Sequence, residues 1–480
     1  ITIIGGTAVN GQLQLSNTTL INDGLITMTD SGGAGEARVS NNSGGITNNS
    51  TIQTLVGSGG GERFISAPVL NNGTFDLDTD TTFTSDISHQ GGGAFDVAAE
   101  TDVKFSGNAL NANGGTFTFG SGAELIFVNS TFSINSNTTL GSNGTLNLGD
   151  SSGNNGNVGG TSTLTVQGVL HANRGEISAP LIPDGGAALF LTAGTENIMT
   201  VSGGVNINTG AVFEVRGASG SAALNISGAV TNAGTIRLSS TTSDDAALDL
   251  GSGASITNTG TIEVLSGEGG SRVISGGTIN NSSGGSINVN SDLSIGSDIN
   301  VNQGSSFTVA SGIDFTLSSN ATMQVNAGIS GSGDFINTGT ISINDSAGAS
   351  TVGSLSNLSG SALLLDSGVS GVTSFTSAGS IANAGNIVFG SGNDGSISLT
   401  VTSGTLDNTG TIQIKDSSSN TNTITASINN SGTLDIDEDV TINMNSGDFD
   451  QLSGGIIDVG TNSTLQFTGT STATDTIDFQ

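Results

Sequence analysis

A short pattern that recurs along the whole chain limits its fold more than any other feature. The pattern is an apolar residue, any residue, Asn, any residue, Gly, Thr or Ser, and then an apolar-any-apolar run. Clear copies are VLNNGTFDL at 69–77, VTNAGTIRL at 230–238, ITNTGTIEV at 256–264, FINTGTISI at 335–343, IANAGNIVF at 381–389, LDNTGTIQI at 406–414 and INNSGTLDI at 428–436, with looser copies at 20–28 and 46–54. Repetition with a period of about 20–50 residues predicts a repeat architecture.

The asparagines of these copies set the period. They are Asn22, Asn48, Asn71, Asn232, Asn258, Asn337, Asn383, Asn408 and Asn430. Neighbouring copies are 22 to 26 residues apart, and weaker copies fill the wider gaps. The 480 residues therefore divide into about twenty units of about 24 residues.

Each unit predicts short β-strands. The apolar-any-apolar alternation has the period of two that is typical of a strand with one buried face, and nothing shows a helical period. A unit of two or three short strands cannot close its own core, but stacked units pair each strand with its equivalent in the next unit. We therefore expect an all-β fold, a single parallel β-helix (β-solenoid) that is continuous over 1–480.

The Asn-x-Gly segment is expected to bend the chain between two strands. Asparagine tolerates left-handed conformations and glycine allows positive φ. Stacked asparagine amides can hydrogen-bond to one another, so we interpret the nine asparagines, which share one phase of the repeat, as a structural ladder rather than an array of ligand sites.

Repeats such as ITNTGTIEV and INNSGTLDI resemble those of large bacterial secreted β-helix proteins, the autotransporter passenger and filamentous-haemagglutinin-like surface proteins. The resemblance covers nearly the whole chain. It implies export, a right-handed coil, an extracellular place on the bacterial cell surface, and a role in adhesion or surface structure.

Charge and composition exclude several partners. Eight Lys and Arg against 40 Asp and Glu give a formal charge of −32, whereas nucleic-acid and anionic-membrane binding both need clustered basic residues. No apolar run reaches the roughly 18 residues of a transmembrane segment. The acidic residues are expected to form a solvated outer face.

An enzyme is the alternative hypothesis, because polysaccharide lyases and hydrolases also use β-helices. Such enzymes need a base or facing carboxylates, and their sugar grooves use Trp or Tyr as stacking platforms. The basic residues are scattered and the chain has no Trp or Tyr. We therefore expect a protein that is not an enzyme and requires no cofactor.

Residues 150–205 follow the repeat poorly and include Pro180 and Pro183. We expect an irregular segment, a loop or insertion that protrudes from one unit. Because function concentrates on loops held by rigid scaffolds, this segment is a candidate for partner binding or catalysis. Its candidate residues are His171, Arg174, Glu176 and Asp184.

Outward-facing carboxylates form a candidate calcium site. In TFDLDTD and TLDIDED the apolar residues face inward, so Asp76, Asp78, Asp435 and Asp437 face outward. The repeat places Asp435 against Asp458 of the next unit, and Lys415 against Asp437. The negative charges of Asp435 and Asp458 would repel each other. Calcium binds six to eight oxygens and could offset this repulsion.

Three segments place an arginine shortly after a glycine: GEARVS at 35–40, GERFIS at 61–66 and GSRVIS at 270–275. Arg38 and Arg63 are 25 residues apart, so we expect them on one outer edge, in a surface row of ion pairs with Glu36 and Glu62. An anion-docking site is the alternative.

The two ends of a solenoid expose unpaired strand edges. The apolar strands ITII, with Ile1, Ile3 and Ile4, and TIDF, with Ile477 and Phe479, lie at these ends. We expect either end-to-end stacking of copies into a filament or sheath, or an adhesin shaft that binds a cell-surface receptor.

Overall fold

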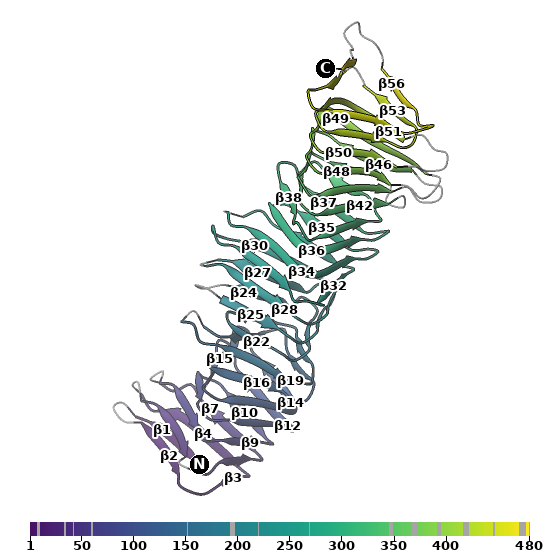
Figure 1. Cartoon of the computed structure of the whole chain (residues 1–480). Helices are drawn as coiled ribbons and strands as arrows, with labels where there is room; N and C mark the ends of the chain where they lie inside the picture. Colours follow the sequence, from purple (N-terminus) through teal and green to yellow (C-terminus); the bar gives the residue numbers. More distant parts are fainter. Residues whose placement is uncertain are drawn as a thin grey trace. The chain divides into compact units, whose positions relative to one another are not determined.

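The computed structural model describes residues 1–480 except 7–9, 33–34, 42, 59–60, 151, 193–196, 219, 268, 345–348, 367–371, 391–394, 416–421, 445–446, 470–476 and 480. The described residues contain no helix (Figure 1). Parallel strands stack into a β-solenoid of about 19 turns of about 23 residues. The predicted all-β, parallel solenoid is confirmed. We call one turn of the solenoid a rung, and equivalent positions in successive rungs a column.

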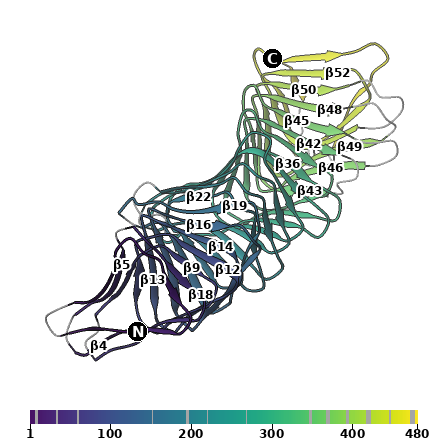
Figure 2. The same ribbon diagram turned by 90° about the horizontal axis from the view of Figure 1, so that it is seen from below.

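The chain forms two compact units, which are described separately. Unit 1 comprises Ile1–Leu248 with Glu268–Gly270, and unit 2 comprises Asp249–Gly267 with Ser271–Gln480. Strand β31 (Ala246–Leu250) contains the boundary. Within each unit a rung has three strands, one on each of three faces, and each strand pairs with its equivalents in the neighbouring rungs (Figure 2).

The faces of unit 1 are named 1a, 1b and 1c. Face 1a consists of β3 (Leu20–Asn22), β6 (Ile46–Asn48), β9 (Val69–Asn71), the first parts of β12 (Ile87–Val97) and β14 (Ala109–Phe119), β16 (Ser130–Ile134), β19 (Gly156–Gly160), β22 (Gly175–Ile177), β25 (Asn197–Val201) and β28 (Ala222–Ile226). Face 1b consists of β1 (Thr2–Gly5), β4 (Leu25–Asp30), β7 (Thr51–Thr54), β10 (Thr74–Leu77), the last parts of β12 and β14, β17 (Thr138–Leu140), β20 (Leu164–Val166), β23 (Leu181–Pro183), β26 (Val205–Ile207) and β29 (Val230–Asn232). Face 1c consists of β2 (Gly11–Leu15), β5 (Ala37–Asn41), β8 (Arg63–Ser66), β11 (Thr81–Phe83), β13 (Asp102–Ser106), β15 (Ala123–Val128), β18 (Gly144–Leu148), β21 (Val169–Ala172), β24 (Ala188–Thr192), β27 (Val212–Gly217) and β30 (Thr235–Ser240).

The faces of unit 2 are named 2a, 2b and 2c. Face 2a consists of the first parts of β34 (Arg272–Asn281) and β36 (Leu293–Val301), β38 (Asp314–Leu317), β41 (Asp334–Asn337), β44 (Leu355–Asn357), β47 (Ile381–Asn383), the last parts of β49 (Ser396–Asn408) and β51 (Asn422–Asn430), β54 (Phe449–Gln451) and β57 (Ile477–Phe479). Face 2b consists of β32 (Ser255–Asn258), the last parts of β34 and β36, β39 (Thr322–Val325), β42 (Thr340–Asn344), β45 (Ala362–Asp366), β48 (Asn386–Gly390), β50 (Thr411–Ile414), β52 (Thr433–Ile436) and β55 (Ile456–Val459). Face 2c consists of β33 (Thr261–Val264), β35 (Ser286–Val289), β37 (Ser306–Val309), β40 (Ile329–Gly331), β43 (Ala349–Val352), β46 (Val372–Ser377), the first parts of β49 and β51, β53 (Val440–Asn443) and β56 (Leu465–Thr468).

The core is built from columns of like side chains. Because strand side chains alternate between the two sides, every second residue points into the solenoid. On face 1c, Phe83, Phe105 and Phe127 are fully buried, and their rings stack with centroids 5.0 and 4.8 Å apart. Parallel, in-register strands about 4.8 Å apart bring equivalent rings into contact from rung to rung.

The glycine of the repeat is required by close stacking. A Cβ atom on Gly410 would lie 2.1 Å from the carbonyl oxygen of Gly385, and one on Gly432 would lie 2.1 Å from that of Gly410. None of these three glycines has a positive φ. The expectation that the repeat glycine supplies positive φ is therefore wrong at these positions, where the corner leaves no room for a side chain.

Candidate functional site

In unit 1 the predicted asparagine ladder runs along face 1a. Asn22 Nδ2 donates to Asn48 Oδ1 at 2.6 Å, and Asn48 Nδ2 donates to Asn71 Oδ1 at 2.7 Å. Each Nδ2 also donates to a backbone carbonyl, that of Thr51 and that of Thr74. Both donor hydrogens of these amides are therefore satisfied inside the solenoid.

In unit 2 a longer ladder runs along face 2a. Its members are Asn337, Asn357, Asn383, Asn408, Asn430 and Gln451, joined by five hydrogen bonds of 2.7 to 2.9 Å. All six side chains are buried, and every Nδ2 donates toward the next rung. The ladder therefore has a single direction.

Three ladder residues are missing from the sequence prediction. Asn281 accepts from Asn258 Nδ2 at 2.7 Å on face 2b, and Asn357 and Gln451 belong to the ladder of face 2a. In each of these copies extra residues separate the amide from the glycine, as in Leu-Ser-Asn-Leu-Ser-Gly at 355–360. A search that allowed this gap to vary would have found them.

The expectation that the nine asparagines share one phase is wrong. Within unit 1, Asn71 lies on face 1a, whereas Asn232 lies on face 1b and follows Ile207 in its column. Within unit 2, Asn258 lies on face 2b and Asn337 on face 2a. Rungs differ in length, so the same motif moves from one face to another along the chain.

Phe75 and Leu77 of β10 are buried, whereas Asp76 and Asp78 are only partly buried, as the alternation predicts. Asp76 pairs with Asp96 of the next rung, and Gln53 Nε2 donates to Asp76 Oδ2 at 2.8 Å from the preceding one. Burial and the charge of Asp76 raise the pKa of Asp78. A glutamine amide thus relieves part of the repulsion in this column.

In unit 2, Asp435 pairs with Asp458, the register expected from the repeat. Gln413 Nε2 donates to Asp435 Oδ2 at 2.9 Å. Ile414 pairs with Ile436, which places the following residues, Lys415 and Asp437, side by side.

Calcium binding by these carboxylates stays a prediction. In the part of the chain that the structure describes, no group of three or more His, Cys, Asp or Glu side chains is placed to hold a metal ion. A melting temperature that is the same in millimolar calcium and in chelator would contradict the prediction.

The expectation of a protruding loop at 150–205 is wrong for the described residues of this segment. They form β19 to β26, and these strands pair in parallel with their neighbours on all three faces. Several of these strands have only three residues, and this is too short for alternation to be visible in the sequence.

The four candidate residues of this segment are not brought together. His171 lies on β21, where its ring stacks on Phe190 with centroids 5.4 Å apart. Asp184 follows β23 and accepts from Asn208 Nδ2 at 2.8 Å. Arg174 and Glu176 lie at β22 and line one cavity.

This cavity has a volume of about 490 Å³, and its wall is mainly polar. Asn155, Asn157, Arg174, Gly175, Glu176, Ile198 and Thr200 line it. Glu176 accepts from Ser202 Oγ at 2.8 Å. A guanidinium, a carboxylate and two amides can together bind a polar partner, and Ile198 adds an exposed apolar contact.

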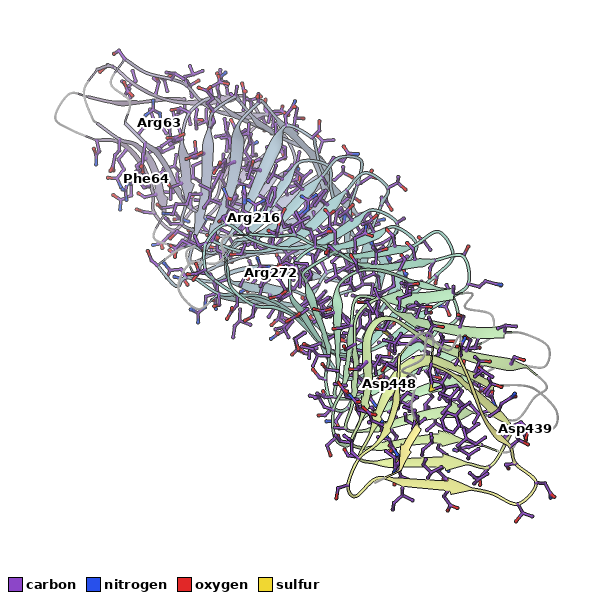
Figure 3. All side chains as sticks on the ribbon, turned by 90° about the horizontal axis from the view of Figure 1, so that it is seen from above. Arg63, Phe64, Arg216, Arg272, Asp439 and Asp448 are labelled. Atoms are coloured by element: carbon purple, nitrogen blue, oxygen red, sulfur yellow. The ribbon has the colours of Figure 1, made fainter. Side chains whose placement is uncertain are left out.

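A second cluster, which the sequence analysis missed, surrounds Glu214 on face 1c, and Figure 3 labels its member Arg216. Glu214 is 2% exposed and accepts from Arg216 Nε at 2.8 Å, Arg237 Nη1 at 3.3 Å and Ser239 Oγ at 2.5 Å. Burial alone would raise the pKa of Glu214, but these hydrogen bonds and the two positive charges hold it below its usual range. Arg216 also lies over the Phe190 ring, 4.6 Å from its centroid.

The Glu214 cluster connects three rungs of face 1c, because Phe190 pairs with Glu214 and Glu214 with Arg237. His171 continues the same column. Burial, and then the charge of Arg216, lower the pKa of His171. The arrangement holds the rungs together through charge and ring stacking.

The prediction that Arg38 and Arg63 form a surface row of ion pairs is wrong. Ala37, not Arg38, pairs with Arg63, so the side chain of Arg63 points inward and is fully buried (Figure 3). Its Nη2 lies 3.1 Å from Asp30 Oδ2 and donates to the Leu55 carbonyl at 2.7 Å. The repeat is one residue longer here than the arginine spacing suggested, and a shift of one residue reverses the side of the strand.

Arg38 and Phe64 take the outer positions of the same two rungs. The Arg38 guanidinium lies 4.5 Å from the centroid of the Phe64 ring and forms an ion pair with Glu36 at 2.9 Å. Arg272 of unit 2 is also buried, at 1% exposure. Two of the three glycine-arginine segments therefore place their arginine inside the solenoid.

Each of the two predicted end strands is paired along one of its edges in the described structure. β1 pairs with β4 and β57 with β54. Ile3 is buried, whereas Ile1 and Ile4 are 58% and 50% exposed. The side chains of Ile477 and Phe479 lie outside the described part of the structure.

Comparison with models of protein families finds no match, and no curated protein matches the sequence. The autotransporter and filamentous-haemagglutinin likeness therefore stays a resemblance in the repeats. Among the described residues, no helix is long and apolar enough to cross a membrane.

Proposed function

We propose that this chain is a non-enzymatic, extracellular structural protein of a bacterial cell surface, in which the solenoid serves as a stiff shaft. The observation that carries the proposal is the unbroken ladder from Asn337 to Gln451. Each of its members is hydrogen-bonded to both neighbouring rungs or ends the row, so a rung cannot leave without exposing buried amides. Such a solenoid resists local opening, which suits a spacer exposed to proteases and force.

We further propose that the solenoid associates end to end with copies of itself. Among the strands that the structure describes, β1, β2 and β3 each pair with one neighbour, and so do β55, β56 and β57. The order of faces along the chain is the same in both sets. A second copy could therefore place β1, β2 and β3 on β55, β56 and β57 in parallel, as one more rung.

Exposed core positions support this contact. Val459 is 43% exposed, whereas Ile436, the residue before it in the same column, is fully buried. Ile457 follows Leu434 in its column and is partly exposed, while Leu434 is buried. A further rung would cover both side chains and remove apolar surface from water.

The test is sedimentation and electron microscopy over a range of protein concentrations. The unaltered protein is expected to form linear assemblies, and Val459→Lys is expected to abolish them because it places a charge in the joint. Val372→Lys is the matched control, since Val372 is also a strongly exposed valine of unit 2, on β46. Single copies at every concentration would overturn end-to-end association.

The adhesin variant of the proposal assigns partner contact to the cavity at Arg174 and Glu176. The combination of charged and amide groups with the exposed Ile198 supports a polar receptor surface. Binding of the purified protein to cell surfaces should fall in Arg174→Ala/Glu176→Ala and persist in Arg38→Ala. Equal binding by both variants would remove this site from the proposal.

The polysaccharide-active enzyme remains the competing hypothesis. It is tested by incubating the protein with neutral and acidic polysaccharides and measuring new reducing ends and unsaturated products. Catalytic release of either would overturn the structural proposal.

A further inference from the structure

A histidine ends the asparagine ladder of face 1a. His89 is the next member of the column after Asn71, and its Nδ1 lies 3.0 Å from Asn71 Nδ2. Both side chains are fully buried. The following position in the column is Ala112, so the row of amides stops at an imidazole.

The hydrogen bonds define the protonation state of this ring. Asn71 uses its Oδ1 to accept from Asn48, so its Nδ2 faces His89 as a donor. Nδ1 of His89 must therefore be the acceptor, and the neutral ring carries its proton on Nε2. Among the described residues Nε2 has no hydrogen-bond partner of good geometry.

The ring has almost no freedom to move. A Cβ atom on Gly115 would lie 2.4 Å from His89 Nε2, and one on Gly93 would lie 3.0 Å from Cε1. The Phe95 and Phe117 rings contact the imidazole edge-on, at centroid distances of 5.9 and 5.0 Å. Two glycines and two aromatic rings thus enclose it.

Little in this enclosure stabilises a positive charge. β9 contributes the neutral Asn71, and β14 contributes Phe117 and the backbone of Thr116. The charge that acts on the ring is that of Asp96, on the outer side of β12. Burial lowers the pKa of His89, and the Thr116 backbone and Asp96 oppose this only in part.

We propose that His89 is an acid-sensitive element that opens the rungs around β9, β12 and β14 when it binds a proton. Protonation turns Nδ1 into a donor, which then faces the donor Nδ2 of Asn71. Within the described residues, Asn71 is the one hydrogen-bond partner of His89 Nδ1, so no acceptor stands in its place.

Rotation of the Asn71 amide does not remove the conflict. It would present Asn71 Nδ2 to Asn48 Nδ2, and so move the clash one rung toward Asn22. A full reversal of the ladder would also break the bonds from these amides to the carbonyls of Thr51 and Thr74. Each of these arrangements of the folded ladder therefore disfavours the protonated form of His89.

Unit 2 provides the internal comparison. Its ladder ends with Asn430 donating to Gln451 Oε1 at 2.9 Å, and an amide does not titrate between pH 5 and 8. The acid response should therefore be confined to unit 1.

The direction of the effect follows from linkage. The folded pKa of His89 lies below its unfolded value, so the unfolded state binds more protons as the pH falls below about 6.5. Stability is complete above that pH and is lost below it. The equilibrium constant for local opening should rise by up to about tenfold per pH unit, until the folded pKa is reached.

The test is hydrogen exchange by mass spectrometry between pH 7.5 and 5, corrected for the intrinsic pH dependence of exchange. Peptides from 69–97 and 109–119 should open with this steep pH dependence, and peptides from 406–436 should not. His89→Asn, which continues the ladder with an amide, should remove the response. His171→Asn, which changes the half-buried histidine of β21, should leave it intact.

Equal pH dependence in the unaltered protein and in His89→Asn would overturn the proposal. If His89→Asn does not fold, the His89 ring can be titrated directly by NMR in the unaltered protein. The proposal requires that it stay neutral down to a pH well below 6.5, and a pKa at or above 6.5 would refute it.

Discussion

Replacing Asn383 tests how much an amide ladder contributes to a solenoid. Asn383 Oδ1 accepts from Asn357 Nδ2 at 2.7 Å, and its Nδ2 donates to Asn408 Oδ1 at 2.7 Å and to the Thr411 carbonyl at 3.1 Å. Asn383→Ala removes all three bonds and leaves a buried donor hydrogen on Asn357 and a buried acceptor on Asn408. Since each unsatisfied buried group costs about 1–3 kcal/mol, the local free energy of opening should fall by about 2–6 kcal/mol.

The matched control is Asn429→Ala in the neighbouring outward column. Asn429 Nδ2 donates to Asp407 Oδ1 at 2.6 Å, but both groups are only partly buried. Water can replace the lost bond, so we expect a loss of about 1 kcal/mol or less. Both variants remove side-chain hydrogen bonds, so the difference between their losses of free energy reports the effect of burial.

The measurement has to be local as well as global. The chain has no Trp or Tyr, so urea unfolding is followed by far-ultraviolet circular dichroism. Stacked rungs can open independently, so hydrogen exchange of peptides covering β44, β47 and β49 gives the local value. If Asn383→Ala changes these peptides no more than Asn429→Ala does, the ladder is not the stabilising element described above.

Phe105→Ala removes a ring that stacks on both Phe83 and Phe127. In urea titrations it should lower the free energy of unfolding of its region by about 3–5 kcal/mol. A loss below about 1 kcal/mol would contradict the packing described. Arg63→Met removes the guanidinium from the buried Asp30 carboxylate and should cost about 3–5 kcal/mol. The double variant Asp30→Asn/Arg63→Met should recover part of this loss in the same titration. The lowered pKa of Glu214 means that its carboxylate stabilises the fold above its unfolded pKa and that this contribution is lost as the pH falls through the folded pKa. Glu214→Gln should therefore be less stable at neutral pH and show a flatter pH dependence in acid than the unaltered protein; parallel curves would refute this.

Local patterns could be predicted from the sequence where they depend on neighbouring residues alone. The period of two identified the buried faces, and the repeat register correctly paired Asp435 with Asp458. Both follow from strand geometry, which is the same in every rung. The asparagine ladders could be predicted in kind for the same reason.

The assignment of residues to faces could not be predicted, because it depends on summed rung lengths. Asn71 and His89 are neighbours in one column although only 18 residues separate them, and Asn48 and Asn71 are 23 apart. A single extra residue before β8 turned Arg63 from the surface into the core. Nothing in a local window measures these lengths, so the Glu214 cluster and the end of the ladder at His89 became visible only in the structure.

The single direction of the ladder on face 2a determines how this solenoid can change its length. A duplicated rung between Asn383 and Asn408 would bring one more asparagine, which accepts from the residue before it and donates to the residue after it, so every amide stays matched. The same duplication at β8 would bury a second guanidinium for the single Asp30 carboxylate. Growth or loss of whole rungs is therefore nearly neutral within an amide ladder and strongly unfavourable beside the Asp30–Arg63 pair.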